Sequence, residues 1–233
     1  MATIAANLQA VHARIALAAQ AANRPPEDIR LLAVSKTFDA ALVNEAWCAE
    51  QHAFGENFAQ EAIDKARKLA NPDIEWHFIG PIQSNKTRLI AEHFAWVHSI
   101  EREKIAQRLN DARPAHLPPL NVLIQVNVSG EASKSGVAPG EERALAVAIR
   151  TLPRLKLRGL MTIPEPTADA AVRRARFARL RELLRPLQAA DAAVDTLSMG
   201  MSDDLEAAIA EGATMVRVGT AIFGTRAAVK SEM

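Results

Sequence analysis

The stretch RLLAVSKTFDAALVNEAWCAEQHAFGENFAQEAIDKARKLANPDIEWHFIG, residues 30–80, alternates short apolar runs with longer segments of helical character. The apolar runs at residues 30–35, 52–56 and 75–80 have the length and composition of buried strands. The segment at residues 58–70 has helical periodicity and is followed by Asn71 and Pro72, which end a helix. Apolar strands joined by helices are typical of a parallel sheet that helices cover.

The same alternation continues through residue 219. Five further strands are predicted at residues 95–100, 120–128, 157–163, 194–200 and 214–219, with helices that include residues 101–112, 140–152 and 168–190. Eight strands of this kind predict an α/β fold, a closed (β/α)8 TIM barrel, with a doubly wound open sheet as the alternative. Because 233 residues that are 49% hydrophobic suffice for one such barrel, we expect a single domain over residues 1–233.

The charge balance excludes some classes of partner. With 28 basic and 27 acidic residues the formal charge is +1, so we expect no nucleic acid and no membrane partner. Six arginines between Arg173 and Arg185 do not change this, because an apolar stripe at helical spacing in the same segment predicts packing against the barrel. The stripe consists of Phe177, Leu180, Leu184 and Leu187.

The single cysteine and the N-terminal segment indicate a reducing compartment. Cys48 allows no intramolecular disulfide, and its helix-like surroundings NEAWCAEQ predict a small core residue. The alanine-rich residues 1–26 have the pattern of neither a signal peptide nor a membrane span. We therefore expect a cytoplasmic protein, and a monomer, and we assign no metal ligand.

Polar residues follow most of the predicted strands. In barrels of this kind, chemistry gathers at the carboxyl ends of the strands, so these residues predict a polar pocket there. They are Ser35, Lys36 and Thr37; Gly55, Glu56 and Asn57; His77 and the segment GPIQSNK; Gln125 and Asn127; Met161 and Thr162; residues 198–202; and Arg217, Gly219 and Thr220.

Lys36 is the candidate for covalent chemistry in this pocket. A partly desolvated lysine has a lowered pKa, and the neutral amine attacks a carbonyl carbon. The alternative is a lysine that only pairs with a carboxylate such as Glu56.

The loops after the last two strands predict a phosphate site. The backbone amides after Gly219 open a short helix, where free N–H groups bind a phosphate dianion, and Ser202 adds a hydroxyl. Alternatively, Ser202 caps the next helix while Asp203 and Asp204 complement its dipole.

An aldehyde-reactive lysine beside a phosphate site suggests pyridoxal 5'-phosphate (PLP). Arg217 would then keep the pyridine nitrogen unprotonated and weaken the ring as an electron sink.

Seven motifs in order closely resemble the pyridoxal phosphate homeostasis protein family: AVSKT, GENFAQE, WHFIGPIQSNK, QVNVSGEASKSG, GLMTI, SMGMSDDLEAAI and VRVGTAIFGTR. The resemblance implies a barrel like the N-terminal domain of alanine racemase, with Lys36 forming the covalent aldimine with PLP. It also implies phosphate contacts from Ser202, Gly219 and Thr220 and places Arg217 at the ring nitrogen. Asn57, His77 and Met199 lie in these motifs and are further candidates for cofactor binding, without a chemical step.

Composition also bears on catalysis. Racemases of the related fold use a tyrosine from another domain as a second acid/base, whereas this sequence contains no tyrosine, and we expect no second domain. His77 or Glu56 could serve as a substitute base. We expect a protein that holds PLP and takes part in its homeostasis and supply to PLP-dependent apoenzymes, with no catalytic residue and without substantial catalysis. The alternatives are a PLP-dependent racemase or decarboxylase and a Schiff-base aldolase that acts on a sugar phosphate. Lys134 could hand the aldehyde over at the edge of the pocket.

Overall fold

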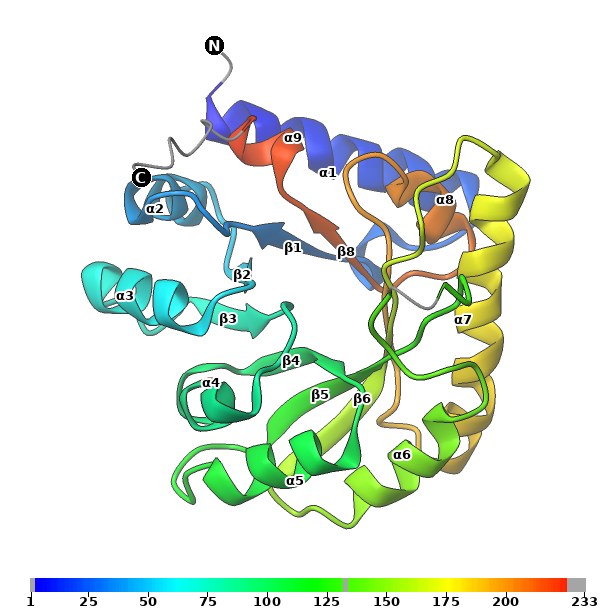
Figure 1. Cartoon of the computed structure of the whole chain (residues 1–233). Coiled ribbons are helices and arrows are strands. Elements are labelled where there is room, and N and C mark those ends of the chain that lie inside the picture. The colour runs from blue at the N-terminus through cyan, green and yellow to red at the C-terminus, as the bar shows by residue number, and fades with distance from the viewer. Residues whose placement is uncertain (1–2, 132–133, 226–233) are drawn as a thin grey trace, which may run out of the picture.

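Eight parallel strands form a closed barrel in the order β1 to β8 (Figure 1). The structure is a computed structural model that describes residues 3–131 and 134–225. The strands are β1 (Arg30–Val34), β2 (Ala53–Glu56), β3 (Glu75–Phe78), β4 (Trp96–Ile100), β5 (Leu120–Gln125), β6 (Leu155–Met161), β7 (Thr196–Ser198) and β8 (Met215–Val218). Closure is made by β1 and β8, which pair in parallel with Leu32 opposite Arg217. This confirms the TIM barrel and excludes the open sheet.

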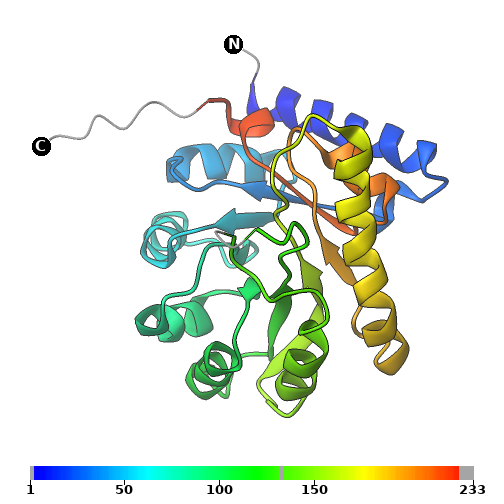
Figure 2. The ribbon, with the colours of Figure 1, turned by 45° about the vertical axis from the view of Figure 1, so that its right-hand side comes forward.

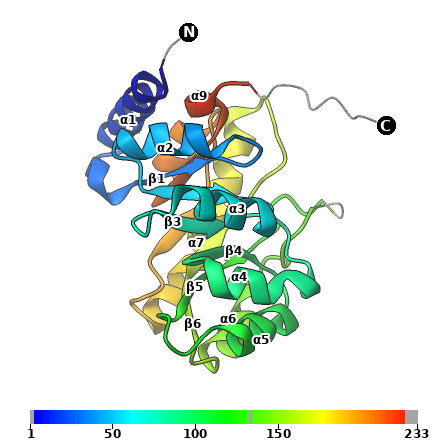
Figure 3. The same cartoon turned by 90° about the vertical axis from the view of Figure 1, so that its left-hand side faces the viewer.

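The helices surround the strands (Figure 2). They are α1 (Ile4–Ala21), α2 (Ala40–Cys48), α3 (Ala59–Leu69), α4 (Thr87–His93), α5 (Glu103–Ala112), α6 (Glu142–Arg150), α7 (Ala170–Ala190), α8 (Leu205–Ala210) and α9 (Thr220–Phe223), with 3-10 turns at Pro26–Asp28 and Ser84–Lys86. Figure 3 shows α2, α3 and α4 on one side of the barrel. Of the helices in the described residues, none is long and apolar enough to cross a membrane.

Helix α1 precedes the barrel and packs against α8 and α9 (Figure 1). Its buried side chains Leu8, Val11 and Ile15 recur at helical spacing, so one face of the helix is apolar. The side chain of Thr3 accepts a hydrogen bond from the amide of Ala6 and caps the helix. Helix α1 therefore covers the part of the barrel that carries the last two strands.

The core lies between the strands and the helices. The central residues of β5, from Val122 to Ile124, are fully buried, as a strand covered on both faces requires. The apolar stripe predicted in α7 is confirmed, because all four of its residues are buried there. Helix α7 begins two residues later than predicted, because Asp169 accepts hydrogen bonds from the amides of Ala171 and Val172 and caps it.

The prediction for Cys48 is wrong. It is the last residue of α2, as the helical pattern suggested, but it is exposed. Helix α2 buries Val43 and Ala46, whereas Cys48 lies one turn after the exposed Asn44, with 3.9 Å between the Asn44 Nδ2 and Cys48 Sγ atoms. Cys48 therefore belongs to the solvent face of the helix.

Candidate functional site

A cavity of about 240 Å³ lies at the carboxyl ends of the barrel strands. It brings together six of the residues predicted from the sequence. One of them lies in β8, and the others lie in the segments that follow β1, β2, β7 and β8. These six are Lys36, Asn57, Ser202, Arg217, Gly219 and Thr220, and the remaining lining residues are Val34, Ile79, Ile163, Met201 and Asp203. The strand ends thus assemble one polar pocket with an apolar wall.

Lys36 lies two residues after Val34, the last residue of β1. Its side chain is partly buried. The next residue, Thr37, has a φ of 68°, a backbone conformation that is uncommon for a β-branched residue. The amide of Thr37 donates a hydrogen bond of 2.5 Å to Oε1 of Glu61 on α3. This contact offsets part of the backbone strain and fixes the segment that carries Lys36.

The segment before Lys36 is fixed by a buried ammonium group. The Nζ atom of Lys65 on α3 lies 2.7 Å from the carbonyl oxygen of Ser35, 2.7 Å from Oε1 of Glu56 and 2.7 Å from Oε1 of Glu61. The Ser35 hydroxyl also donates to Oε1 of Glu56, at 2.7 Å. Helix α3 therefore holds the backbone on both sides of the candidate lysine.

Glu56 is the carboxylate that the sequence offered as an alternative partner for Lys36. In the structure it is fully buried and pairs with Lys65. Burial raises the pKa of the Glu56 carboxyl above its usual range, while the charge and hydrogen bond of Lys65 act against this. Among the described residues, Oε2 of Glu56 is buried without a hydrogen-bond partner.

Arg217 is buried and lines the cavity. Its Nη1 donates to the Ser198 hydroxyl at 2.8 Å, and its Nη2 donates to the Thr162 carbonyl at 2.9 Å. Burial lowers the pKa of Arg217 to about 10, with the charge of Asp204 acting in the opposite direction, so the side chain is still a cation at neutral pH. A permanent cation at this position disfavours protonation of a ligand nitrogen beside it.

The opposite side of the cavity carries hydroxyl groups and the start of a helix. The Thr220 hydroxyl donates to the Ser202 hydroxyl at 3.3 Å. Gly219 caps α9, and the first amides of a helix have no intrahelical acceptor. The alternative in which Ser202 caps the helix that follows β7 is wrong, because this helix, α8, begins at Leu205 with Asp204 in the cap position.

Helix α1 supports this side of the cavity. Arg14 Nη2 donates to the Ser202 carbonyl at 2.8 Å, and the same guanidinium pairs with Glu206 on α8, also at 2.8 Å. Asp204 accepts a hydrogen bond of 2.6 Å from the amide of Met201 and thereby closes the turn that leads into α8. The Ser202 hydroxyl is thus presented by a loop that is held from two sides.

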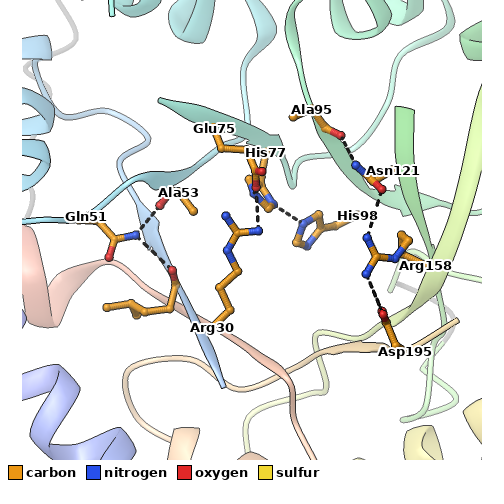
Figure 4. Close-up of polar contacts among 11 residues, drawn as sticks. Arg30, Gln51, Ala53, Glu75, His77, Ala95, His98, Asn121, Arg158 and Asp195 are labelled. Atoms are coloured by element: carbon orange, nitrogen blue, oxygen red, sulfur yellow. Dashed lines mark hydrogen bonds and ion pairs between the residues drawn. The ribbon is translucent and has the colours of Figure 1, made fainter. Parts of the chain in front are cut away.

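Two candidate residues lie elsewhere. Met199 is fully buried in the hydrophobic core. His77 is also fully buried, and its ring lies inside the barrel between Glu75 and His98, so its predicted place at the mouth is wrong (Figure 4). The physical reason is the alternation along β3, which turns His77 to the barrel interior one layer below the carboxyl ends. Neither residue lines the cavity.

The donor set fits PLP. An amine suits an aldehyde, a guanidinium suits a pyridine nitrogen, and two hydroxyls beside a helix start suit a phosphate group. All three kinds of donor line the same cavity. No group of three or more His, Cys, Asp or Glu side chains within residues 3–131 and 134–225 is arranged to hold a metal ion.

The fold and this cavity define the class of barrel. The chain matches the family model of the alanine racemase N-terminal domain over residues 6–227. A protein of Pseudomonas aeruginosa named pyridoxal phosphate homeostasis protein is 65% identical over 226 residues, which cover 97% of each chain. The protein of the same name from Escherichia coli K12 is 56% identical and covers 96% of this chain and 97% of that one. The chain belongs to the pyridoxal phosphate homeostasis protein family.

Solved structures agree with this assignment. PipY of Synechococcus elongatus PCC7942, solved with PLP bound, has a TM-score of 0.83 at 37% identity over 95% of this chain and 100% of that one. A protein from Bifidobacterium adolescentis has a TM-score of 0.88 at 36% identity over 94% of both chains. Alanine racemase of Corynebacterium glutamicum shares the fold alone, with a TM-score of 0.67 at 17% identity over 97% of this chain and 63% of that one.

Sequence reasoning missed Lys65 and His98, and it placed Ser198 among the residues at the strand ends without its partners. Lys65 has a signal in the sequence, because Glu61 lies four residues before it on the predicted helix, a spacing that favours an ion pair. His98 and Ser198 stand inside predicted strands, where a polar residue marks an interior contact. Their partners lie 19 to 100 residues away in the sequence, so the contacts follow only from the closed barrel.

Proposed function

We propose that this protein holds PLP reversibly as a Schiff base on Lys36 and takes part in intracellular PLP homeostasis and supply, without substantial catalysis. The observation that carries the proposal is the single cavity that Lys36, Arg217, Ser202 and Thr220 share. The names of the relatives and the PLP bound to PipY support it. We further propose a monomeric cytoplasmic protein that delivers PLP to apoenzymes.

Each residue of the cavity has a role in this proposal. The neutral amine of Lys36 attacks the aldehyde carbon, and the Schiff base forms with loss of one water. The hydroxyls of Ser202 and Thr220 and the first amides of α9 bind the phosphate, while Arg217 faces the ring nitrogen. Bound PLP supplies an electron sink, which an unprotonated ring nitrogen weakens.

The absence of substantial catalysis is inferred from the groups around Lys36. A racemase needs a second acid/base opposite the lysine, and the sequence contains no tyrosine. The two substitutes considered from the sequence are engaged elsewhere, because Glu56 pairs with Lys65 and His77 bonds to Glu75 and His98. Both are fully buried and neither lines the cavity.

The test is a visible absorption spectrum of the purified protein with added PLP, before and after borohydride. We expect a yellow band that borohydride removes and that the Lys36→Ala variant lacks. Lys134→Ala is the matched control and should keep the band, since Lys134 lines only a neighbouring cavity, which shares Asn57, Ile79 and Ile163 with this one. A protein that stays colourless with added PLP contradicts the proposal and favours a Schiff-base aldolase.

A racemase is the second candidate, because the matching family model is that of a racemase domain. It predicts exchange of the α-hydrogen of an amino acid with solvent deuterium in the PLP-loaded protein. We expect no such exchange above the level of free PLP.

In the same preparation, the rate of PLP transfer to an apoenzyme should change in Lys134→Ala if this residue hands over the aldehyde, and an unchanged rate would remove that role.

A further inference from the structure

A line of five polar side chains, four of them buried, crosses the barrel interior below the candidate cavity. Arg217 Nη1 lies 2.8 Å from Ser198 Oγ, and Ser198 Oγ lies 3.0 Å from His98 Nδ1. His98 Nε2 lies 2.9 Å from His77 Nδ1, and His77 Nε2 bonds to Oε1 of Glu75. We call these five residues, Glu75, His77, His98, Ser198 and Arg217, the buried relay. Figure 4 shows the part of it formed by Glu75, His77 and His98.

The Glu75 end of the relay fixes the direction of every hydrogen bond in it. Burial acts to raise the pKa of Glu75, but the hydrogen bond from His77 and the charge of Arg30 lower it overall, so Glu75 is an ionised acceptor. His77 must therefore donate from Nε2 and, as a neutral ring, accept at Nδ1. His98 then donates from Nε2 and accepts at Nδ1, so the Ser198 hydroxyl donates to His98 and accepts from Arg217.

The opposite end is consistent with the same direction. A guanidinium has five N–H donors and no acceptor, so Arg217 can only donate to Ser198. Burial, together with the nearby cations, holds the pKa of His98 well below its usual value, which keeps the ring neutral. Every group of the relay therefore has one role, and a change at any member alters the hydrogen bond that reaches Arg217.

The relay is anchored at the amino ends of the strands, opposite the cavity. Arg30, the first residue of β1, pairs with Glu75 at 2.8 Å (Figure 4). The His77 ring stacks on Trp96, with ring centroids 5.4 Å apart and an interplanar angle of 4°. The guanidinium of Arg158 lies 5.0 Å above the Trp96 ring. These contacts fix the plane of His77 and hence the direction of its hydrogen bonds.

A purely structural barrel layer would be apolar, because buried polar groups cost free energy unless each finds a partner. Here four polar side chains are buried in the interior beside the partly exposed Glu75, and the line ends on Arg217, the buried cation of the candidate cavity. We propose that His98 and His77 are positioning residues for PLP binding, which act through Ser198 to hold the Arg217 guanidinium against the ring nitrogen. This inference rests on the proposed function.

The first measurement needs no cofactor. Nitrogen-15 NMR of the histidine side chains in the apo protein should show His77 and His98 as neutral rings, each protonated at Nε2 and not at Nδ1. Either ring protonated at Nδ1, or at both nitrogens, at neutral pH would overturn the relay.

The second measurement is PLP affinity, followed by absorption. His98→Leu removes both hydrogen bonds at similar volume, and we expect PLP binding to weaken about 10-fold, with a shifted absorption maximum of bound PLP. His98→Gln can still accept and donate, so its affinity should stay within about 2-fold of the wild type.

Leu123→Ala is the matched control for general damage to the barrel. Leu123 is fully buried beside Trp96 and Met161 and makes none of the relay's hydrogen bonds. It should lower the melting temperature and leave the affinity and the spectrum unchanged. Equal losses of affinity in His98→Leu and Leu123→Ala, or no loss in His98→Leu, would overturn the positioning role. A wild-type protein that binds no PLP would instead remove the proposed function, and the tautomers would still report on the relay by themselves.

Discussion

At the scale of single residues, Lys65 is the side chain on which the position of Lys36 depends. Its ammonium is buried and contacts two carboxylates and the carbonyl of Ser35. Lys65→Met removes the positive charge and leaves Glu56 buried without its partner. Breaking a buried pair in this way costs about 3 to 5 kcal/mol, so we expect the free energy of unfolding to fall by about that amount in urea denaturation.

A matched control lies on the same helix. Lys68 is exposed, so Lys68→Met should change the unfolding free energy by less than about 0.5 kcal/mol. Adding Glu56→Gln to Lys65→Met should restore part of the stability, because it removes the unpaired charge. If Lys65→Met were as stable as Lys68→Met, the Lys65 contacts would not hold the Lys36 segment.

The residues that the sequence revealed are those at strand ends. Lys36 and Arg217 could be placed in one pocket because parallel strands bring their carboxyl ends to the same face. His77 could not be placed, because its depth in the barrel depends on the stagger between neighbouring strands. Lys65 was missed because a helix pattern shows which side chains share a face but not which loop that face meets.

At the scale of elements, β6 depends on a glycine where it pairs with β7. Gly159 pairs with Thr196 at a φ of 153°, and an added Cβ would lie 1.9 Å from the Thr196 carbonyl oxygen. We expect Gly159→Ala to lower the free energy of unfolding by about 3 kcal/mol, since the two strands must separate.

Gly130→Ala separates this close approach from backbone strain alone. Gly130 also has a positive φ, of 72°, but nothing lies within 4 Å of the Cβ position. Its substitution should cost about 1 to 2 kcal/mol. Urea unfolding of both variants gives the comparison. Similar losses of unfolding free energy in the two would show that the close contact between β6 and β7 tolerates a side chain.

The elements themselves were largely predictable. All eight strands lie within one to three residues of the predicted positions, because apolar runs bounded by helices have few other solutions in a parallel barrel. The error at Cys48 arose inside a correctly predicted helix. A helix rotated by one residue exposes a different face, and composition does not fix that phase.

At the scale of the whole molecule, two polar networks meet at the candidate cavity from opposite sides. The Lys65 contacts reach it from α3, outside the barrel, and the buried relay reaches it from the amino ends of the strands, through the barrel interior. A sequence pattern predicts neither network as a whole, because, apart from the Glu61–Lys65 pair within α3, the contacts join residues that only the folded barrel brings together. Both networks contain buried ionisable groups, such as Glu56 and His98, so the stability of the molecule depends on pH.

The two histidines of the relay determine the sign of that dependence near neutral pH. Burial lowers the pKa of both His77 and His98 in the folded protein, while in the unfolded chain a histidine titrates near pH 6.5. As the pH falls below about 6.5, the unfolded chain takes up protons that the native rings do not, so native stability is lost. Each such proton contributes a slope of about 1.4 kcal/mol per pH unit once the unfolded histidine is charged.

His98→Gln removes one of the two protons and should make the loss of unfolding free energy between pH 7.5 and 5.5 shallower by about that slope, measured by urea unfolding of the apo protein. His93→Gln, at an exposed position of α4, is the control and should follow the wild type. Parallel curves for wild type and His98→Gln would mean that His98 takes up its proton in the native state as readily as in the unfolded chain, which a neutral ring between Ser198 and His77 does not allow.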